Sequence, residues 1–460
     1  MKKEGIILIK NGTIVRFNES LKADILIEAG KIAKIQTQID DFEAFKVIDA
    51  SGKYVFAGGI DPHVHLDLPT PAGNSSDNFE SGSKAAVFGG TTTVIDFVTP
   101  FRNQNLIEAL NLRKADAKNC YTDFSFHVSP IGWNEDTENQ IIKCIKEEGI
   151  SSFKVYMAYD IGLDDYELVK VMNAVGKQNG LVTVHAENGK VIEFLRQKSV
   201  LEGNTSPKYH ALTRPVALEE EAINRAIEIA KLTDCKLYVV HVSSAKGMLR
   251  IEKAQREELP IYAETCPHYL LLDESLYNQE FKKSAKYVLS PPLRTLSDQE
   301  KLWASLSIHT IQSIGTDHCP FNLKGQKDAG IHDFTKIPNG AGGIEYRLSL
   351  LYTYGVLTGK ITMNQFVGLV STLPARIFGL GRQKGDLKIG LDADVVIWNP
   401  DTEKIISLEN QHQNCDSNIY EGLKIKGFAE TVLLRGELII ENEQLVSQPC
   451  GIFLKRGLGN

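Results

Sequence analysis

Two histidines alternate at the end of an apolar stretch near the start of the chain, in Gly59-Ile60-Asp61-Pro62-His63-Val64-His65. On an extended backbone, residues two positions apart project to the same side, so His63 and His65 can aim both imidazoles at one point. This is the minimum geometry for holding a metal ion. Because so short a pattern also arises by chance, a metal site requires further ligands elsewhere in the chain.

Candidates for these further ligands stand at the ends of later apolar runs. His185, His241 and Asp317 each close a run that is typical of a buried strand, over residues 181–184, 237–240 and 314–316. Four histidines and one carboxylate at equivalent positions favour a metal centre over packed or hydrogen-bonded histidines. His127 and His318 occupy similar places, and we expect them to support the ligands through hydrogen bonds.

Lys154 lies in the middle of another apolar strand candidate, residues 151–157. Burying an ammonium group without a partner costs several kcal/mol or drives the amine neutral. A neutral amine can take up carbon dioxide as a carbamate, which offers one oxygen to each of two metal ions. A lysine that reaches solvent from an edge strand is the alternative, and it fits the apolar neighbours less well.

The segments that carry these residues alternate between strand and helix from about residue 56. The strand candidates are Tyr54–Gly58, Thr91–Phe97, Tyr121–Val128, Ser151–Met157, Leu181–Ala186, Lys236–Val242, Ile261–Thr265 and Gln312–Thr316. The helix candidates between them are Glu80–Phe88, Gln104–Ala117, Thr137–Glu148, Tyr166–Gln178, Pro215–Leu232, Ala245–Glu257 and Ser297–Ser307. This alternation predicts an α/β fold, a (β/α)₈ barrel of the TIM type, whose active site lies at the carboxyl ends of the strands.

Both ends of the chain have a different, β-rich pattern. Residues 1–56 contain short apolar runs with turn signals at Asn11-Gly12, which favours a hairpin, and at Ala29-Gly30-Lys31. Strand patterns return after about residue 383, including two runs joined at Arg435-Gly436. We expect residues 1–56 and 383–440 to build one β-sandwich domain beside a barrel over 57–382. Residues 441–460 are expected to form a C-terminal tail with few packing constraints.

The composition argues against several classes of partner. The 460 residues are 42% hydrophobic and carry a net charge of −7, which disfavours nucleic acid or an anionic membrane as the main partner. Seven scattered cysteines give no disulfide framework. The apolar stretch after Lys2-Lys3 is too short for a signal peptide, and no run is long enough to cross a bilayer. We therefore expect a cytoplasmic protein.

The ligand candidates and their order resemble the amidohydrolase superfamily, and more closely its cyclic amidases, the dihydropyrimidinases and D-hydantoinases. The resemblance spans nearly the whole chain and includes residues 89–93, 153–159, 185–188, 265–270, 290–294, 315–321 and 337–340. It implies two zinc ions with a hydroxide between them, and N6-carboxylated Lys154 as a bridge. His63, His65 and Asp317 would hold the first ion, and His185 and His241 the second. Manganese or cobalt could replace zinc at such ligands.

The resemblance also implies a small cyclic amide as substrate. Tyr159 would donate its hydroxyl to the developing oxyanion, and Ser290 and Asn339 would hold the ring amide, largely through main-chain groups. Asp317 would pass a proton from the nucleophile to the leaving ring nitrogen. The expected reaction converts dihydropyrimidines or 5-substituted hydantoins to N-carbamoyl amino acids. Relatives of this kind are usually homotetramers, so a homo-oligomer is expected.

Three other functions stay open at this point. Dihydroorotases usually carry an arginine two residues after the second histidine, where this chain has Asp67, which would repel an anionic substrate. Allantoinase is the nearer alternative, because allantoin is an uncharged hydantoin. The dihydropyrimidinase-related scaffold proteins keep the fold but lose metal ligands, whereas every ligand position is filled here. The sequence departs from the commoner hydantoinase pattern at residues 68–74, Asp160 and Tyr346, which leaves the natural substrate open.

Overall fold

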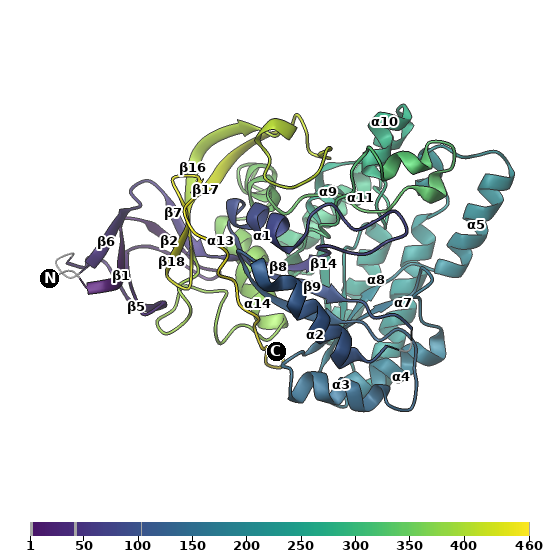
Figure 1. Ribbon diagram of the computed structural model, residues 1–460, viewed down its shortest axis with the longest axis horizontal. Helices are drawn as coiled ribbons and strands as arrows, with labels where there is room; N and C mark the ends of the chain where they lie inside the picture. Colours follow the sequence, from purple (N-terminus) through teal and green to yellow (C-terminus); the bar gives the residue numbers. More distant parts are fainter. Residues whose placement is uncertain (1–2, 41–43, 103, 460) are drawn as a thin grey trace.

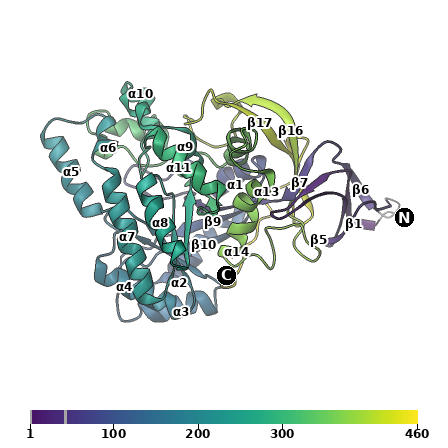
Figure 2. The same ribbon diagram turned by 180° about the vertical axis from the view of Figure 1, so that it is seen from behind.

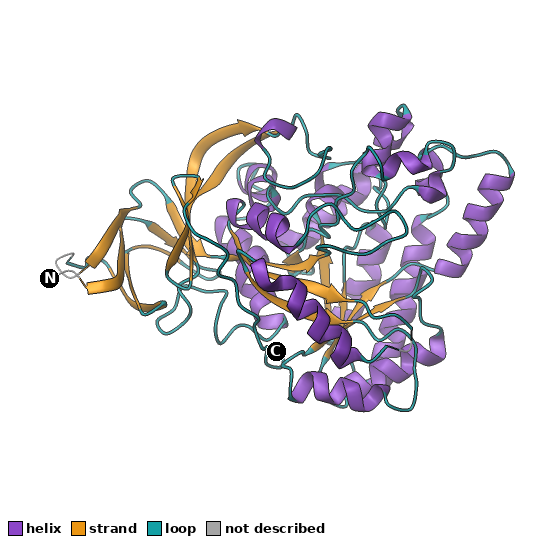
Figure 3. Ribbon diagram, viewed as in Figure 1, coloured by secondary structure: helices purple, strands orange, loops and turns teal. Residues whose placement is uncertain are grey.

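A parallel eight-stranded sheet forms the centre of the molecule in the computed structural model, which describes residues 3–40, 44–102 and 104–459. Its strands follow one another in sequence order and curve into a barrel surrounded by helices (Figures 1 and 3). They are β8 (Gly59–Val64), β9 (Thr91–Val98), β10 (Asp123–Val128), β11 (Ser152–Tyr156), β12 (Leu181–His185), β13 (Lys236–Val239), β14 (Ile261–Thr265) and β15 (Ser313–Ile314). The predicted TIM-like barrel is thus confirmed.

The helices between and after these strands cover the outside of the barrel. They are α1 (Phe79–Phe88), α2 (Leu106–Asp116), α3 (Thr137–Lys146), α4 (Asp165–Gly176), α5 (Gly189–Leu201), α6 (Lys208–Leu212), α7 (Val216–Thr233), α8 (Ala245–Arg256), α9 (Pro267–Leu271), α10 (Phe281–Ser284), α11 (Leu296–Ser307), α12 (Arg347–Leu351), α13 (Met363–Val367) and α14 (Leu373–Ile377). Helices α4, α7 and α8 pack side by side, as Figure 2 shows. Among the described residues, no helix is both long enough and apolar enough to span a membrane.

Short helical turns complete these elements. They are η1 (Ala117–Asn119), η2 (Glu274–Asn278), η3 (Ala285–Tyr287), η4 (Lys327–Gly330), η5 (Phe334–Lys336) and η8 (Leu408–Asn410), with π-helical turns η6 (Tyr352–Val356) and η7 (Gly368–Thr372). Local capping explains why several of the longer helices begin where they do. In α4, for example, the Asp164 carboxylate accepts from the backbone N–H of Glu167, whose side chain accepts from the Asp164 N–H in return.

Side chains complete the barrel where β15 meets β8. The buried Arg347 guanidinium donates to the carbonyl oxygens of Ile60 in β8 and Ile314 in β15, both at 2.8 Å. Thr316 Oγ1 donates to Asp61 Oδ2 at 2.6 Å across the same seam. This seam joins the strand that leads into His63 to the strand that leads into Asp317, so it holds the two ends of the predicted ligand set together.

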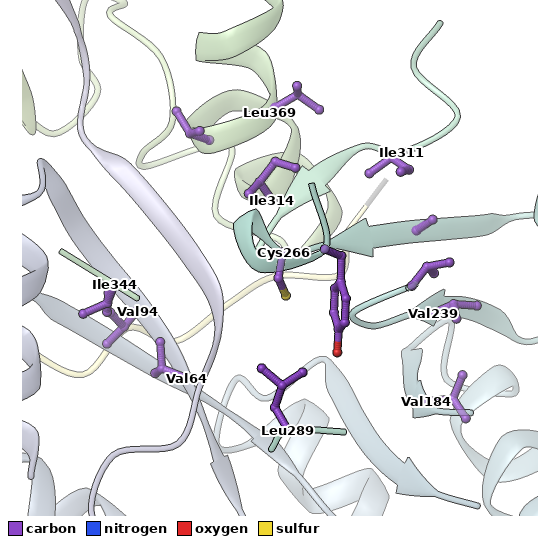
Figure 4. Close-up of a cluster of buried hydrophobic side chains, with 14 of the residues drawn as sticks. Val64, Val94, Val184, Val239, Cys266, Leu289, Ile311, Ile314, Ile344 and Leu369 are labelled. Carbon is purple, nitrogen blue, oxygen red and sulfur yellow. The ribbon is translucent and has the colours of Figure 1, made fainter. Parts of the chain in front are cut away.

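Apolar side chains from several barrel strands and from the segments after β15 form the largest core of the protein. Figure 4 shows part of it, with Val64, Val184 and Val239 from three barrel strands. Ile344 and Leu369, which follow the barrel in sequence, belong to the same core. The strands are buried along nearly their whole length, which accounts for the continuous apolar runs in the sequence.

Two further sheets lie beside the barrel, one built from N-terminal strands alone and one that combines strands from both ends of the chain. The four-stranded sheet has the order β5-β4-β1-β6, and the seven-stranded sheet has the order β19-β18-β17-β16-β7-β2-β3. Their strands are β1 (Lys3–Lys10), β2 (Thr13–Val15), β3 (Ser20–Lys22), β4 (Asp24–Glu28), β5 (Lys31–Gln36), β6 (Ala44–Asp49), β7 (Tyr54–Ala57), β16 (Val395–Ile405), β17 (Lys424–Leu434), β18 (Glu437–Glu441) and β19 (Gln444–Leu445). Residues of both sheets share one core, including Ile25 and Ile27 with Val395 and Ile397. The expected β-structure from both termini is present beside the barrel (Figure 1).

Two local predictions were wrong. Residues 54–58 do not form the first barrel strand, because β7 pairs with β16 and β2 in the seven-stranded sheet and the barrel begins with β8. Asn11-Gly12 is not a hairpin turn, because β1 and β2 leave it into different sheets. In contrast, the turns at Ala29-Gly30 and Arg435-Gly436 do join antiparallel neighbours.

The C-terminal segment packs against the barrel floor. Arg456 is 4% exposed and donates to the carbonyl oxygens of Phe126 and Phe378 and to the hydroxyls of Ser125 and Ser152. The expectation of few packing constraints is therefore wrong for this part of the chain. The segment crosses the amino ends of the strands, opposite the predicted ligands, and ends beside α14 (Figure 1).

Candidate active site

One pocket of about 730 Å³ opens at the carboxyl ends of the barrel strands. All nine predicted site residues line it: His63, His65, Lys154, Tyr159, His185, His241, Ser290, Asp317 and Asn339. They come from six different strands or the loops that follow them, so only the folded barrel brings them together. The structure therefore places every predicted site residue at one location.

Asp317 links the histidines of the His63-Val64-His65 stretch. Its Oδ1 lies 3.1 Å from Nε2 of His63 and 3.1 Å from Nε2 of His65. Although burial opposes ionisation, the charged form of His63 and the close approach of both rings keep the pKa of the Asp317 carboxyl well below its usual range. Asp317 is thus a carboxylate, and its oxygen and both imidazoles converge on one place.

His185 and His241 form the second group. Nδ1 of His185 lies 2.9 Å from Nε2 of His241. The ring of His241 stacks beside that of His63, with 5.3 Å between centroids, so the two groups are adjacent. Burial lowers the pKa of His241 well below its usual value, and the same effect lowers the pKa of His185. Both rings are therefore neutral and have lone pairs available for a metal ion.

The donor set fits a metal ion. The ligand atoms of His63, His241 and Asp317 all lie within 4.8 Å of one another. Among the described residues, the buried atoms His63 Nε2 and His65 Nδ1 have no hydrogen-bond partner. Burial disfavours the charged imidazole of His63, yet the carboxylates of Asp317 and Glu264 raise its pKa to about 9, so a positive charge is stabilised here. Imidazole and carboxylate ligands are those that zinc prefers.

Lys154 is buried beside these ligands, with 1% of its surface exposed. Its Nζ lies 4.9 Å from the ring centre of Phe97 and 5.2 Å from that of Tyr156. No ion pair to Lys154 is present among the described residues. Burial lowers the pKa of this amine to about 8, so an appreciable fraction is neutral near physiological pH. The expected burial of the lysine in an apolar strand is confirmed.

Two buried acids that the sequence pattern did not predict orient the histidines. Glu264 Oε1 lies 2.7 Å from Nδ1 of His63, and Glu187 Oε2 lies 3.0 Å from Nε2 of His185. Burial opposes the charge of Glu187, but the Arg214 guanidinium, 2.8 Å away, lowers its pKa to about 2. Each acid fixes which ring nitrogen faces the pocket. In the sequence, Glu264 lies inside an apolar strand and Glu187 just after one. A charged residue in such a place, as with Lys154, could have identified both acids.

Tyr159, Ser290 and Asn339 lie around the same pocket. Tyr159 has 44% of its surface exposed because it lines the open cavity, but the surrounding walls desolvate its hydroxyl and raise the pKa of the phenol to about 12. It therefore keeps its proton at neutral pH and can donate it in a hydrogen bond. Ser290 is 6% exposed, and its Oγ is buried without a partner among the described residues.

The two other histidines at the strand ends are hydrogen-bonded through both ring nitrogens, as expected for supporting residues. His127 contacts the hydroxyl of Ser152 at 2.6 Å and the carbonyl oxygen of Pro62 at 2.9 Å. His318 contacts Asp77 Oδ2 at 3.0 Å and accepts from the Gly343 N–H at 3.1 Å. Neither ring has a nitrogen left over for a metal ion.

Three site residues have a left-handed backbone. The φ angles are 68° at Tyr159, 40° at His241 and 50° at Asp317. Residues other than glycine rarely adopt this conformation, and such positions gather at functional sites because the surrounding structure must hold them there. In this chain each of the three positions follows a barrel strand by two or three residues, and each residue lines the pocket.

The unusual sequence features fall partly in the pocket mouth. Leu68, residues 69–72 and Asp160 line the cavity, whereas Tyr346 is buried and does not. Asp67 accepts a hydrogen bond from Asn74 Nδ2 at 2.8 Å and is not among the lining residues. Most of the features that depart from the commoner pattern therefore line the pocket, and Tyr346 is the exception.

Comparisons with known proteins agree with the geometry. A family model described as the Amidohydrolase family matches residues 54–438. The chain is 47% identical over 454 residues to the D-hydantoinase of Geobacillus stearothermophilus, which covers 98% of this chain and 96% of that protein. The crystal structure of a dihydropyrimidinase from Brevibacillus agri NCHU1002 matches with a TM-score of 0.97 and 42% identity over 99% of both chains.

A crystal structure of a D-hydantoinase matches with a TM-score of 0.96 and 46% identity, and covers 98% of this chain and 99% of that one. The resemblance drawn from the ligand pattern is thereby confirmed. Because the family model matches most of the chain and the relatives match nearly all of it, this protein belongs to the amidohydrolase family.

Proposed function

We propose that this protein is a metal-dependent cyclic amidase, which hydrolyses the ring amide of dihydropyrimidines or 5-substituted hydantoins to N-carbamoyl amino acids. The observation that carries the proposal is the convergence of four histidines, a lysine and an aspartate on one pocket. The high identity to proteins named D-hydantoinase supports the substrate class.

Two zinc ions fit the two adjacent ligand groups. His63, His65 and Asp317 would hold one ion, and His185 and His241 the other, with Lys154 between them as a carbamate. The carbamate forms when the neutral amine attacks carbon dioxide and releases one proton, and the buried position of Lys154 favours the neutral amine. When bound, zinc makes water acidic enough to be a nucleophile near neutral pH and polarises a carbonyl group.

The protein's own residues would each have a separate role in the reaction. Asp317 would accept a proton from the attacking water and deliver it to the ring nitrogen as the carbon–nitrogen bond breaks. Tyr159 would donate its phenolic hydrogen to the carbonyl oxygen as negative charge develops there. The main-chain groups of Ser290 and Asn339 would hold the ring amide in place. The net reaction adds one water and opens the ring.

The pocket is less suited to an anionic ring. The position where dihydroorotases usually have an arginine is Asp67, two residues after His65, and an acid there disfavours an anionic ring substituent. Allantoin, which is uncharged, remains the alternative to test. We also propose a cytoplasmic location and a homotetramer, and light scattering of the purified protein at several concentrations would test the oligomeric state.

The decisive experiment is a hydrolysis panel on purified protein supplied with zinc and bicarbonate. Dihydrouracil, hydantoin, a 5-aryl hydantoin, allantoin and dihydroorotate would be compared by kcat/KM. Preference for dihydrouracil or a hydantoin supports the proposal, and turnover of allantoin or dihydroorotate alone overturns the substrate class. Native mass spectrometry of wild type and Lys154→Ala would test the carbamate, because only wild type should carry the added mass of carbon dioxide.

A further inference from the structure

Lys327 is a second fully buried lysine, with 1% of its surface exposed, at the start of η4 (Lys327–Gly330). Unlike buried Lys384, which contacts Asp123, Asp392 and Asp394, it forms no ion pair among the described residues. Burying an ammonium group without an ion-pair partner is unfavourable, so other contacts of the group must offset this free energy.

Two main-chain carbonyl groups are the hydrogen-bond partners of Lys327. Its Nζ donates to the oxygen of Val288 at 2.9 Å and to the oxygen of Pro338 at 3.1 Å. These carbonyls belong to separate loops that are 50 positions apart in the sequence. The lysine side chain thus cross-links two loops that share no strand.

Both loops lead directly into the pocket. Val288 stands two residues before Ser290, and Pro338 is followed by Asn339. The N–H of Gly340 also donates to the Val288 oxygen, at 3.1 Å, so the loops meet at the carbonyl that Lys327 contacts. Gly340 has a φ of 146°, and a Cβ there would come 2.3 Å from the Cys319 oxygen, which leaves the loop little room to shift.

We propose that Lys327 is a positioning residue for the ring amide, which holds the loops of Ser290 and Asn339 at the separation that the substrate requires. This inference rests on the proposed function, because it concerns the two residues assigned there to amide recognition. Lys327 itself does not line the pocket, so it acts through the main chain of its partners.

The residue before Lys327 extends this arrangement to a third side of the pocket. Gln326 Nε2 donates to the carbonyl oxygens of Asn74 at 2.8 Å and Ala72 at 3.3 Å, in the loop that follows the first two histidines. Two consecutive side chains therefore tie three pocket-lining loops to one short helical turn. In the part of the chain that the structure describes, Lys327 has no carboxylate partner, which is consistent with this role because its hydrogens are directed to carbonyl groups instead.

The kinetic test compares wild type with Lys327→Met, which keeps the length of the side chain and removes its donors. Contacts to the ring amide act in both the ground state and the transition state, so their loss raises KM more than it lowers kcat. We expect KM for hydantoin or dihydrouracil to rise about tenfold, with zinc content unchanged. Lys384→Met is the matched control, since Lys384 is equally buried but lies at the amino end of β10.

Hydrogen exchange of the zinc-loaded protein supplies a readout that does not depend on turnover. The Gly340 amide should exchange faster in Lys327→Met than in wild type and be unchanged in Lys384→Met. If wild type hydrolyses no cyclic amide, the proposed function is wrong. The comparison of Gly340 exchange would still decide whether Lys327 holds the loops. Unchanged KM in an active Lys327→Met, or unchanged exchange at Gly340, overturns the inference.

Lys327→Gln keeps the test available if Lys327→Met does not fold. Its amide group supplies two N–H donors without a charge, so it should restore KM and Gly340 exchange part of the way toward wild type. The amide nitrogen of glutamine stands one bond further from both carbonyl oxygens, so KM and Gly340 exchange equal to those of wild type would show that hydrogen bonding by this side chain does not set the loop positions.

Discussion

Glu264 Oε1 lies 2.7 Å from Nδ1 of His63, and the same oxygen accepts from the His241 backbone N–H at 3.2 Å. One buried carboxylate therefore fixes a residue in each of the two ligand groups. We expect Glu264→Gln to weaken metal binding by about 10- to 100-fold, the usual effect of removing such a supporting group. Zinc retained during competition with a chelator measures this change.

Glu219→Gln is the matched control for Glu264. Glu219 is also buried, at 2% exposed, but it contacts Ser243 and Arg294 rather than a histidine. It should lower stability without changing zinc affinity. Equal zinc retention in Glu264→Gln and wild type would contradict the orienting role of Glu264.

Asp317 contacts both His63 and His65 at 3.1 Å and is held as a carboxylate. Asp317→Asn keeps the shape of the side chain but cannot accept a proton, so we expect kcat to fall by about 10²–10⁴, the range for loss of a general acid–base group. Zinc content must be measured in the same preparation, because Asp317 is also a candidate ligand.

Asp67→Asn provides the comparison for Asp317, since Asp67 is near the site but does not line the pocket. It should retain most of the activity of wild type. Near-normal turnover by Asp317→Asn would rule out the proton-transfer role proposed for this residue.

Tyr159 keeps its proton at neutral pH because the pocket walls raise the pKa of its phenol to about 12. Tyr159→Phe should lower kcat by about 10²–10³, the usual cost of one oxyanion donor, while zinc content stays unchanged. Tyr166→Phe is the control, because Tyr166 is 66% exposed on α4. A loss seen only as a higher KM would instead assign Tyr159 to substrate binding.

Much of this architecture was predictable from residue spacing. Seven of the eight barrel strands were predicted from apolar runs. This was possible because strands that are buried on both faces are continuously apolar and do not alternate with polar residues. The exception, residues 54–58, is equally apolar but pairs with β16, and pairing partners do not appear in a local pattern. For the same reason, Asn11-Gly12 was mistaken for a hairpin turn.

The ligand candidates were also accessible from sequence, since each closes a strand. The residues that hold these ligands and the pocket loops in place were not accessible from the sequence. Glu264 and Lys327 act through partners distant in the chain, His63 for one and the Val288 carbonyl for the other. The left-handed backbone at His241 and Asp317 is likewise set by tertiary packing, because no local rule places a non-glycine residue there.

Lys327 also makes stability depend on pH. Burial lowers the pKa of its amine from 10.5 to about 7. Between these values the unfolded chain binds the proton and the folded chain releases it, so the free energy of unfolding rises with pH across this window. From about pH 7 to about pH 8.5, wild type should gain roughly 1–2 kcal/mol relative to Lys327→Met.

Denaturant unfolding of both proteins at fixed protein and zinc concentrations measures this difference. Other groups titrate alike in the two proteins and cancel. The thiols nearest to the amine, Cys319 and Cys415, stay uncharged over this range, because burial raises the pKa of each. A stability difference that is constant with pH would mean that Lys327 remains an ammonium ion in the folded protein, balanced by its two carbonyl contacts alone.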